Sequence, residues 1–119
     1  AAAYSAGFNT SFYVGLKSAN IKVIPVDINA MFKDVRANAA AFGFTNSTGT
    51  ACNIAVLPNN SSLLCSPATL VSPNAPQTYI FADQVHPTTG LHAIIADFVK
   101  SLIDGPNTYS TMTEVPYPG

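Results

Sequence analysis

Residues 77 to 103 place two secondary-structure patterns on either side of one short polar turn. Residues 77 to 81 are rich in β-branched and aromatic side chains, which favours a strand. Apolar side chains then recur at helical spacing between residues 88 and 103, at Leu91, Ile94, Ile95, Phe98, Val99 and Leu102. A strand that leads directly into a helix is the repeating unit of α/β folds. The segment therefore predicts an α/β domain with a parallel sheet, in which ligands bind at the carboxyl ends of the strands.

The turn itself contains a carboxylate and an imidazole three residues apart, Asp83 and His86. Asp83 can accept the Nδ1 proton of His86 and stabilise the imidazolium, which leaves Nε2 free to take a proton from a serine. Pro87 disfavours helix at His86 and keeps it in a turn, and Thr88 is placed to cap the helix that follows. An aspartate three residues before a histidine occurs by chance in roughly one chain of this length in ten. The flanking strand and helix make it a specific prediction of the base half of a hydrolytic triad.

The rest of the chain alternates helix and strand. Two further helices are predicted by apolar side chains at helical spacing, one over residues 5 to 19 and one beginning near residue 28. Residues 21 to 26 predict a strand, although Pro25 removes one ladder donor and indicates a strand end or an edge. Residues 43 to 76 are expected to form a long polar loop. Two strands alone would leave unpaired sheet edges, so we expect other polypeptide to supply the remaining strands.

Cys52 and Cys65 bracket a segment that contains proline, asparagines and paired serines, which predicts an irregular loop. A disulfide between them would stabilise the fold by about 3 kcal/mol and would favour an extracytoplasmic location. Two buried free thiols are the alternative, because free cysteine packs as a small hydrophobe. A zinc site is disfavoured by the spacing of the cysteines and of the nearby histidines.

Two other polar residues are candidates for less specific roles. His92 falls within the predicted helix that follows the turn and is expected to be structural or to face solvent. Asp27 follows a predicted strand and is expected to cap the next helix. Asp83, His86 and His92 have no further partner at a recognisable ligand spacing, so the sequence gives no reason to expect a metal or any other cofactor.

The charge pattern excludes one class of partner. Charged residues make up 9% of the 119 residues, and the formal net charge is −1 without a basic stripe. Nucleic-acid binding therefore has no electrostatic basis in this sequence. The low charge suits a secreted or surface-displayed protein, and no apolar run reaches the roughly 18 residues that a membrane-spanning helix needs.

The block Asp-Gln-Val-His-Pro-Thr at residues 83 to 88 resembles, without a gap, the last sequence block of the GDSL, or SGNH, family of serine esterases and lipases. Upstream, residues 8–9, 23–32 and 41–46 resemble in succession the GDSL esterases that are passenger domains of bacterial autotransporters. The resemblance covers roughly residues 4 to 104. It implies that residues 1 to 106 are the C-terminal portion of a three-layer α/β/α SGNH-hydrolase domain, which is flavodoxin-like. It also implies that Asp83 and His86 are two members of a catalytic triad.

The family's other catalytic motifs are not found in the chain. The serine of the family lies in a Gly-Asp-Ser motif, and its oxyanion hole uses a glycine and the asparagine of a Gly-x-Asn-Asp motif. None of these occurs here, and no Gly-x-Ser-x-Gly elbow occurs either. A minimal member needs about 200 residues, the size of an ordinary α/β domain. We therefore expect an N-terminal fragment of the same domain to carry Gly-Asp-Ser, and the chain to be inactive without it.

The implied function is that of a carboxylesterase or lipase, acting on a small ester or a lipid through an acyl-enzyme. A non-catalytic secreted or surface binding module, derived from a hydrolase domain, is the alternative. Residues 107 to 119 contain two prolines and no periodicity, which predicts a linker. The resemblance implies a bacterial extracytoplasmic protein, secreted or displayed on the outer membrane, with an outer-membrane β-barrel following in the full-length protein.

Overall fold

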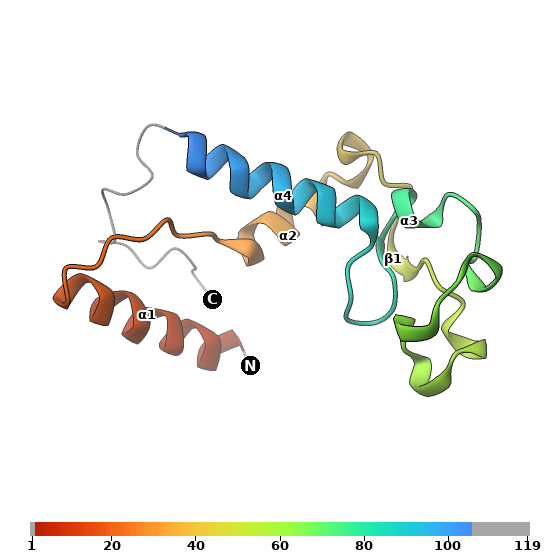
Figure 1. The fold of residues 1–119 in the computed structure, drawn as a ribbon, viewed down its shortest axis with the longest axis horizontal. Coiled ribbons are helices and arrows are strands. Elements are labelled where there is room, and N and C mark those ends of the chain that lie inside the picture. Colours follow the sequence, from red (N-terminus) through yellow and green to blue (C-terminus); the bar gives the residue numbers. More distant parts are fainter. Residues whose placement is uncertain (1, 106–119) are drawn as a thin grey trace. The chain divides into compact units, whose positions relative to one another are not determined.

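The structure is a computed structural model that describes residues 2 to 105 (Figure 1). Its helices and strands, in chain order, are α1 (Ala2–Ser18), α2 (Ile28–Ala37), β1 (Asn46–Thr50), α3 (Ala75–Thr78), β2 (Tyr79–Phe81) and α4 (Thr89–Asp104). Five short 3-10 turns lie between residues 39 and 69. The chain forms two compact units, one from its two ends and one from Phe32–Ala96. The predicted linker at residues 107 to 119 lies outside the described residues.

The unit formed by the chain ends contains α1 and the beginning of α2. Both helices confirm the predictions from apolar spacing, and α1 begins three residues earlier than expected. The Asp27 carboxylate accepts a hydrogen bond from the backbone N–H of Ala30 at 2.9 Å, so Asp27 caps α2 as expected. None of the helices within residues 2 to 105 combines the length and the apolar character that crossing a bilayer requires.

The predicted strand at residues 21 to 26 is wrong. These residues have no regular secondary structure, and no strand of the described part of the chain pairs with them. A strand requires hydrogen bonds to a neighbouring chain segment, and its side-chain pattern alone does not supply them. Pro25 also removes one of the donors that such pairing would use.

The Phe32–Ala96 unit contains a two-stranded parallel sheet of β1 and β2, which confirms the α/β class with parallel pairing. Asn46 pairs with Tyr79 and Thr50 with Phe81, with an irregularity between the two pairs. The expectation of a loop throughout residues 43 to 76 is therefore wrong for β1. Its sequence, Asn-Ser-Thr-Gly-Thr, has no apolar alternation, and the strand forms because β2 offers a pairing partner.

The core of this unit is built around β2. Ile80 of β2 and Leu91 of α4 are fully buried, and Val35 of α2 is nearly so. The rings of Phe32 and Phe81 stack with their centroids 6.1 Å apart. Because Ile80 is enclosed on its strand, the position of the residues that follow β2 is fixed by the core.

The predicted strand at residues 77 to 81 begins two residues late, since residues 75 to 78 form the single helical turn α3. Pro76 stands in the first turn of α3, where a missing N–H costs nothing. The helix α4 approaches α3 closely at Gly90. A Cβ atom added to Gly90 would lie 3.1 Å from the Cα atom of Gln77 and 3.1 Å from the carbonyl oxygen of Pro76.

Replacing Gly90 with alanine is expected to destabilise the protein by about 1–3 kcal/mol, because both of these atoms belong to backbone that cannot rotate away. Gly15→Ala in α1 is the matched control, since an added Cβ there meets no atom within 4 Å. That change should be neutral or stabilise by up to about 1 kcal/mol through helix propensity. Thermal unfolding of both variants measures the difference, and an equal rise in Tm for both would contradict the tight contact.

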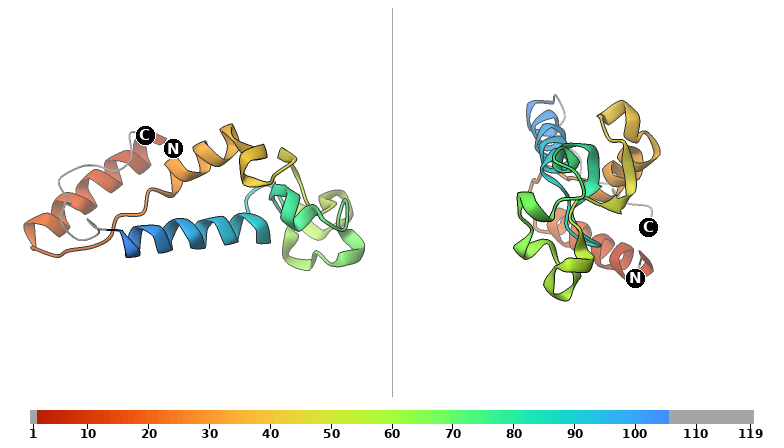
Figure 2. Two further views of the ribbon diagram at one scale, coloured as in Figure 1. Left: turned by 90° about the horizontal axis from the view of Figure 1, so that it is seen from above. Right: turned by 90° about the vertical axis from the view of Figure 1, so that its right-hand side faces the viewer.

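Cys52 and Cys65 form a disulfide, as the sequence predicts. The segment between them consists of short turns rather than a long helix or strand, as the green part of the ribbon shows (Figure 2). Cys52 is buried and also forms an isolated antiparallel bridge with Leu70. The disulfide therefore ties this irregular segment to the edge of the sheet.

Candidate active site

The candidate site lies on the turn that joins β2 to α4 (Figure 1). Backbone hydrogen bonds close this turn at its base: Ala82 N–H donates to the carbonyl of His86 at 2.8 Å, and Thr88 N–H donates to the carbonyl of Ile80 at 3.0 Å. Asp83 and His86 lie inside the closed turn. They are consequently held at the carboxyl end of β2, where ligand sites of parallel sheets occur.

Thr88 fixes the other end of the turn. Its hydroxyl is buried, donates to the carbonyl of Tyr79 at 2.6 Å and accepts from the backbone N–H of Leu91 at 3.2 Å. The second bond caps the first turn of α4, which confirms the capping role expected for Thr88. The strand and the helix are thus joined by a single side chain directly beside the candidate site.

The carboxylate of Asp83 contacts the imidazole of His86. Nδ1 of His86 lies 3.0 Å from Oδ1 and 2.9 Å from Oδ2 of Asp83. An ionised carboxylate can only accept hydrogen bonds, so Nδ1 carries the proton. The contact that the Asp-x-x-His spacing predicts is therefore present in the fold, and the catalytic role of the pair stays a prediction.

Three backbone amides also donate to Asp83. The N–H groups of Val85 and His86 donate to Oδ1 at 2.8 and 2.7 Å, and the N–H of Ser62 donates to Oδ2 at 2.7 Å. Ser62 comes from the disulfide-linked segment and is 21 residues away in sequence. Both carboxylate oxygens are therefore fixed, one by its own turn and the other by a separate segment.

These donors determine the charge of Asp83. Burial, which leaves the residue 3% exposed, by itself raises the pKa of the carboxyl group because it disfavours the charged form. The hydrogen bonds from His86, Ser62 and Val85 together outweigh burial and hold the pKa of Asp83 well below its usual range. Asp83 is consequently an ionised acceptor at neutral pH, able to stabilise a positive charge on the neighbouring ring.

The side chain of His86 is exposed to solvent, whereas that of Asp83 is buried. Its side chain is 65% exposed, although Nδ1 faces the buried carboxylate. Within residues 2 to 105 no hydrogen bond to Nε2 of His86 is found. The ring therefore combines a fixed orientation at one nitrogen with an open position at the other, as a general base requires.

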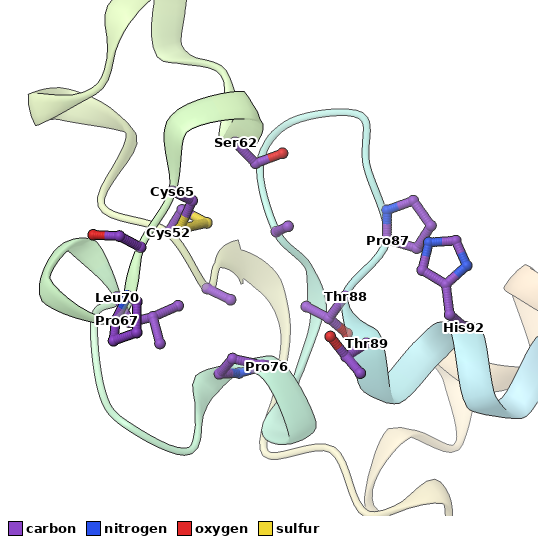
Figure 3. A pocket seen from close by; sticks show the side chains of 13 residues that line it. Cys52, Ser62, Cys65, Pro67, Leu70, Pro76, Pro87, Thr88, Thr89 and His92 are labelled. Carbon is purple, nitrogen blue, oxygen red and sulfur yellow. A yellow bond between two sulfur atoms is a disulfide. The ribbon is translucent and has the colours of Figure 1, made fainter.

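A cavity of about 390 Å³ lies beside the turn, between the disulfide-linked segment and the start of α4 (Figure 3). Ala82 and Pro87, which precede and follow the Asp83–His86 pair, line it together with the disulfide. His92 of α4 also lines the cavity and is exposed, in keeping with the expected solvent-facing position. Residues 2 to 105 contain no group of three or more potential metal ligands.

Ser62 is the one contributor to the site that sequence reasoning missed. It acts mainly through its backbone amide, which every residue except proline carries, while its hydroxyl adds a smaller contribution that also lowers the pKa of Asp83. Its position between two cysteines that flank a loop was the only available hint. The site is therefore partly built by a segment whose sequence reveals no function.

Comparison with known proteins places these residues in context. The chain is 31% identical over 84% of its length to Lipase 1 of Photorhabdus luminescens. It is 35% identical over 75% of its length to the GDSL esterase/lipase At1g71691 of Arabidopsis thaliana. It is 30% identical over 93% of its length to Esterase EstA of Pseudomonas aeruginosa. No family model matches the chain, and no solved structure matches it significantly.

The aligned region is a minor part of each relative: 15% of Lipase 1, 24% of the Arabidopsis protein and 17% of EstA. The parallel α/β arrangement of residues 32 to 96 is consistent with one portion of a GDSL, or SGNH, hydrolase domain. Relatives named GDSL esterase/lipase, lipase and esterase match most of the chain at 30–35% identity. The chain is therefore a homologue of the GDSL hydrolases, and it corresponds to one part of their length.

Proposed function

We propose that this chain supplies the general base, His86, and the carboxylate that orients it, Asp83, of a serine ester hydrolase. The observation that carries the proposal is the exposed imidazole of His86, whose Nδ1 is bonded to the buried and ionised Asp83. This arrangement presents Nε2 in the tautomer that accepts a proton. A surface histidine without a function would not require a buried carboxylate beside it that is itself held by three backbone amides.

The reaction is hydrolysis through an acyl-enzyme. Nε2 of His86 takes the proton of a serine hydroxyl while the serine oxygen attacks the ester carbonyl, and the developing imidazolium is stabilised by Asp83. His86 then protonates the departing alcohol. Water repeats the sequence on the acyl-enzyme, with His86 again as the base, and releases the acid.

The serine and the oxyanion donors come from polypeptide outside this chain. Two facts support this assignment: the sequence has no Gly-Asp-Ser motif, and the chain spans less than a quarter of the relatives it matches. The chain by itself is then inactive, and a fragment of the same domain is its essential partner. The substrate is a small ester or a lipid, and the Cys52–Cys65 disulfide supports an extracytoplasmic site of action.

A non-catalytic binding module derived from a hydrolase is the second candidate. The absence of a nucleophile motif from the sequence is the observation that favours it. The two candidates differ in one measurable property, the presence of a reactive serine in the full-length protein.

Labelling with a fluorophosphonate probe tests the proposal, because the probe reacts only with a serine that a triad activates. We expect the full-length protein to be labelled and this chain expressed alone to remain unlabelled. A correctly folded full-length protein that takes up no probe and hydrolyses no ester would instead establish the binding module.

A further inference from the structure

The two oxygens of Asp83 are held in different ways. Oδ1 accepts from the N–H groups of Val85 and His86, which belong to the same turn and move with it. Oδ2 accepts from only one backbone amide among the described residues, that of Ser62 at 2.7 Å. Rotation of the carboxylate about its Cβ–Cγ bond would break the Ser62 bond. Ser62 thus adds a support from outside the turn to the plane in which the carboxylate faces Nδ1 of His86.

Ser62 in turn has few other ties to the Phe32–Ala96 unit. Over residues 56 to 65, the described backbone hydrogen bonds close short turns within the segment itself. Leu57 is buried, whereas Val56, Leu63 and Leu64 are exposed, so apolar packing anchors the segment at one point. The remaining connection is covalent, through the sulfur of Cys65, three residues after Ser62.

The disulfide connects Ser62 to the turn that carries Asp83 and His86. Cys65 is bonded to the buried Cys52, and the N–H of Cys52 donates to the carbonyl of Ala82 at 3.0 Å. Ala82 directly precedes Asp83. A ring of bonds therefore joins the two segments. It runs from Asp83 through Ala82, Cys52, the disulfide, Cys65 and Ser62, and the hydrogen bond from the Ser62 amide to Asp83 closes it. Figure 3 shows Ser62 beside the turn, with the Cys52–Cys65 disulfide nearby.

We propose that Ser62 is a positioning residue for the Asp83–His86 pair, and that the Cys52–Cys65 disulfide holds its amide against Asp83. The catalytic consequence rests on the proposed function, whereas the structural consequence for the His86 ring does not. Without this amide Asp83 keeps its two donors from the turn, but its Oδ2 loses the backbone donor that comes from outside the turn, and backbone amides then hold the carboxylate at Oδ1 alone. Proton transfer at Nε2 then becomes slower, while substrate binding is unaffected.

Ser62→Pro in the full-length protein removes the amide hydrogen directly. The backbone accepts proline there, because Ser61 is extended, with φ −106° and ψ 143°, and Ser62 begins a 3-10 turn. Ser62→Ala keeps the amide and removes only the hydroxyl, which makes a smaller contribution to lowering the pKa of Asp83. Leu63→Ala is the matched control, since this neighbouring side chain is 85% exposed. We expect kcat to fall about ten- to a hundredfold in Ser62→Pro with KM nearly unchanged, less in Ser62→Ala, and not in Leu63→Ala.

A second readout separates positioning from a general loss of stability. In protein labelled with ¹⁵N-histidine, the imidazole nitrogen signals of His86, identified by their loss in His86→Ala, should move in Ser62→Pro, while those of His92 stay in place. Reduction of the folded wild-type protein with a phosphine, which is oxidised as the disulfide becomes two thiols, should move the same signals. This second arm needs no substitution and applies even where Ser62→Pro does not fold.

The inference is overturned when neither Ser62→Pro nor reduction moves the His86 signals, or when both leave kcat unchanged in an active enzyme. Signals that move in a protein with no esterase activity would support the positioning role and refute the proposed function. The two proposals therefore fail separately.

Discussion

Replacing His86 with alanine is expected to lower kcat of the full-length enzyme by about 10⁴- to 10⁶-fold, the scale on which loss of a triad base acts. In the proposed mechanism, the variant lacks the group that takes the serine proton and protonates the leaving alcohol. The fold should survive, because the side chain is 65% exposed and Asp83 keeps its backbone donors from Val85, Ser62 and residue 86. Steady-state hydrolysis of a chromogenic ester, with circular dichroism of the same sample, measures both quantities.

The control for this substitution is Gln84→Ala in the same turn. Gln84 is exposed and lies between Asp83 and His86 in sequence, so the variant changes a side chain of the same turn and leaves the Asp83 and His86 side chains in place. It should retain the wild-type kcat. Activity in His86→Ala comparable with that of Gln84→Ala would show that the base is another residue.

Replacing Asp83 with asparagine is expected to lower kcat about 10⁴-fold and also to destabilise the protein by about 1–3 kcal/mol. The amide side chain has one acceptor oxygen where the carboxylate has two, so it cannot satisfy the donors on both sides. Its NH₂ group either faces an amide N–H or turns toward Nδ1 of His86 and favours the wrong tautomer. Asp97→Asn, the same chemical change at an exposed position of α4, should alter neither quantity.

The pH dependence of the unfolding free energy tests whether the negative charge of Asp83 causes the destabilisation expected in Asp83→Asn. The folded pKa of Asp83 is well below its unfolded value of about 4, so the unfolded state binds the proton first as pH falls. The stability that ionised Asp83 provides is therefore complete above about pH 4 and is lost progressively as the pH falls from there toward the folded pKa. The difference in unfolding free energy between wild type and Asp83→Asn should shrink over that range. A difference that stays constant from pH 6 to pH 3 would mean that the carboxylate is not stabilised by these donors.

The helices were predictable because their apolar side chains recur at a spacing that only a helix brings to one face. Ile28, Met31 and Val35 define α2 in this way, and Thr88 marks the beginning of α4 by its capping hydroxyl. The strands were less predictable. β1 has a polar sequence and forms only because β2 lies beside it, whereas residues 21 to 26 have a strand-like sequence without a partner in the described chain. Strand formation depends on pairing that a single segment does not encode.

The same distinction applies to the candidate site. Asp83 and His86 were predictable because their contact is local, within one turn whose flanking elements are also local. Ser62 was not, because it reaches Asp83 across 21 residues and mainly through a backbone amide, a group common to nearly all amino acids. The predicted disulfide indicated that the segment between Cys52 and Cys65 is held in place, but it did not indicate that this segment contacts Asp83.

The encoding of Asp83 and His86 in a single four-residue turn has a kinetic consequence. Slow fluctuations of the surrounding domain move the Asp83 carboxylate and the His86 imidazole together, so the distance between them changes little. Two distances join separate segments and are exposed to such motion: that from the Ser62 amide to Asp83 and, in the proposed mechanism, that from the imidazole to the serine hydroxyl. If the proposed mechanism holds, heat or mild denaturant should lower turnover by misaligning the serine before the Asp83–His86 hydrogen bonds are lost.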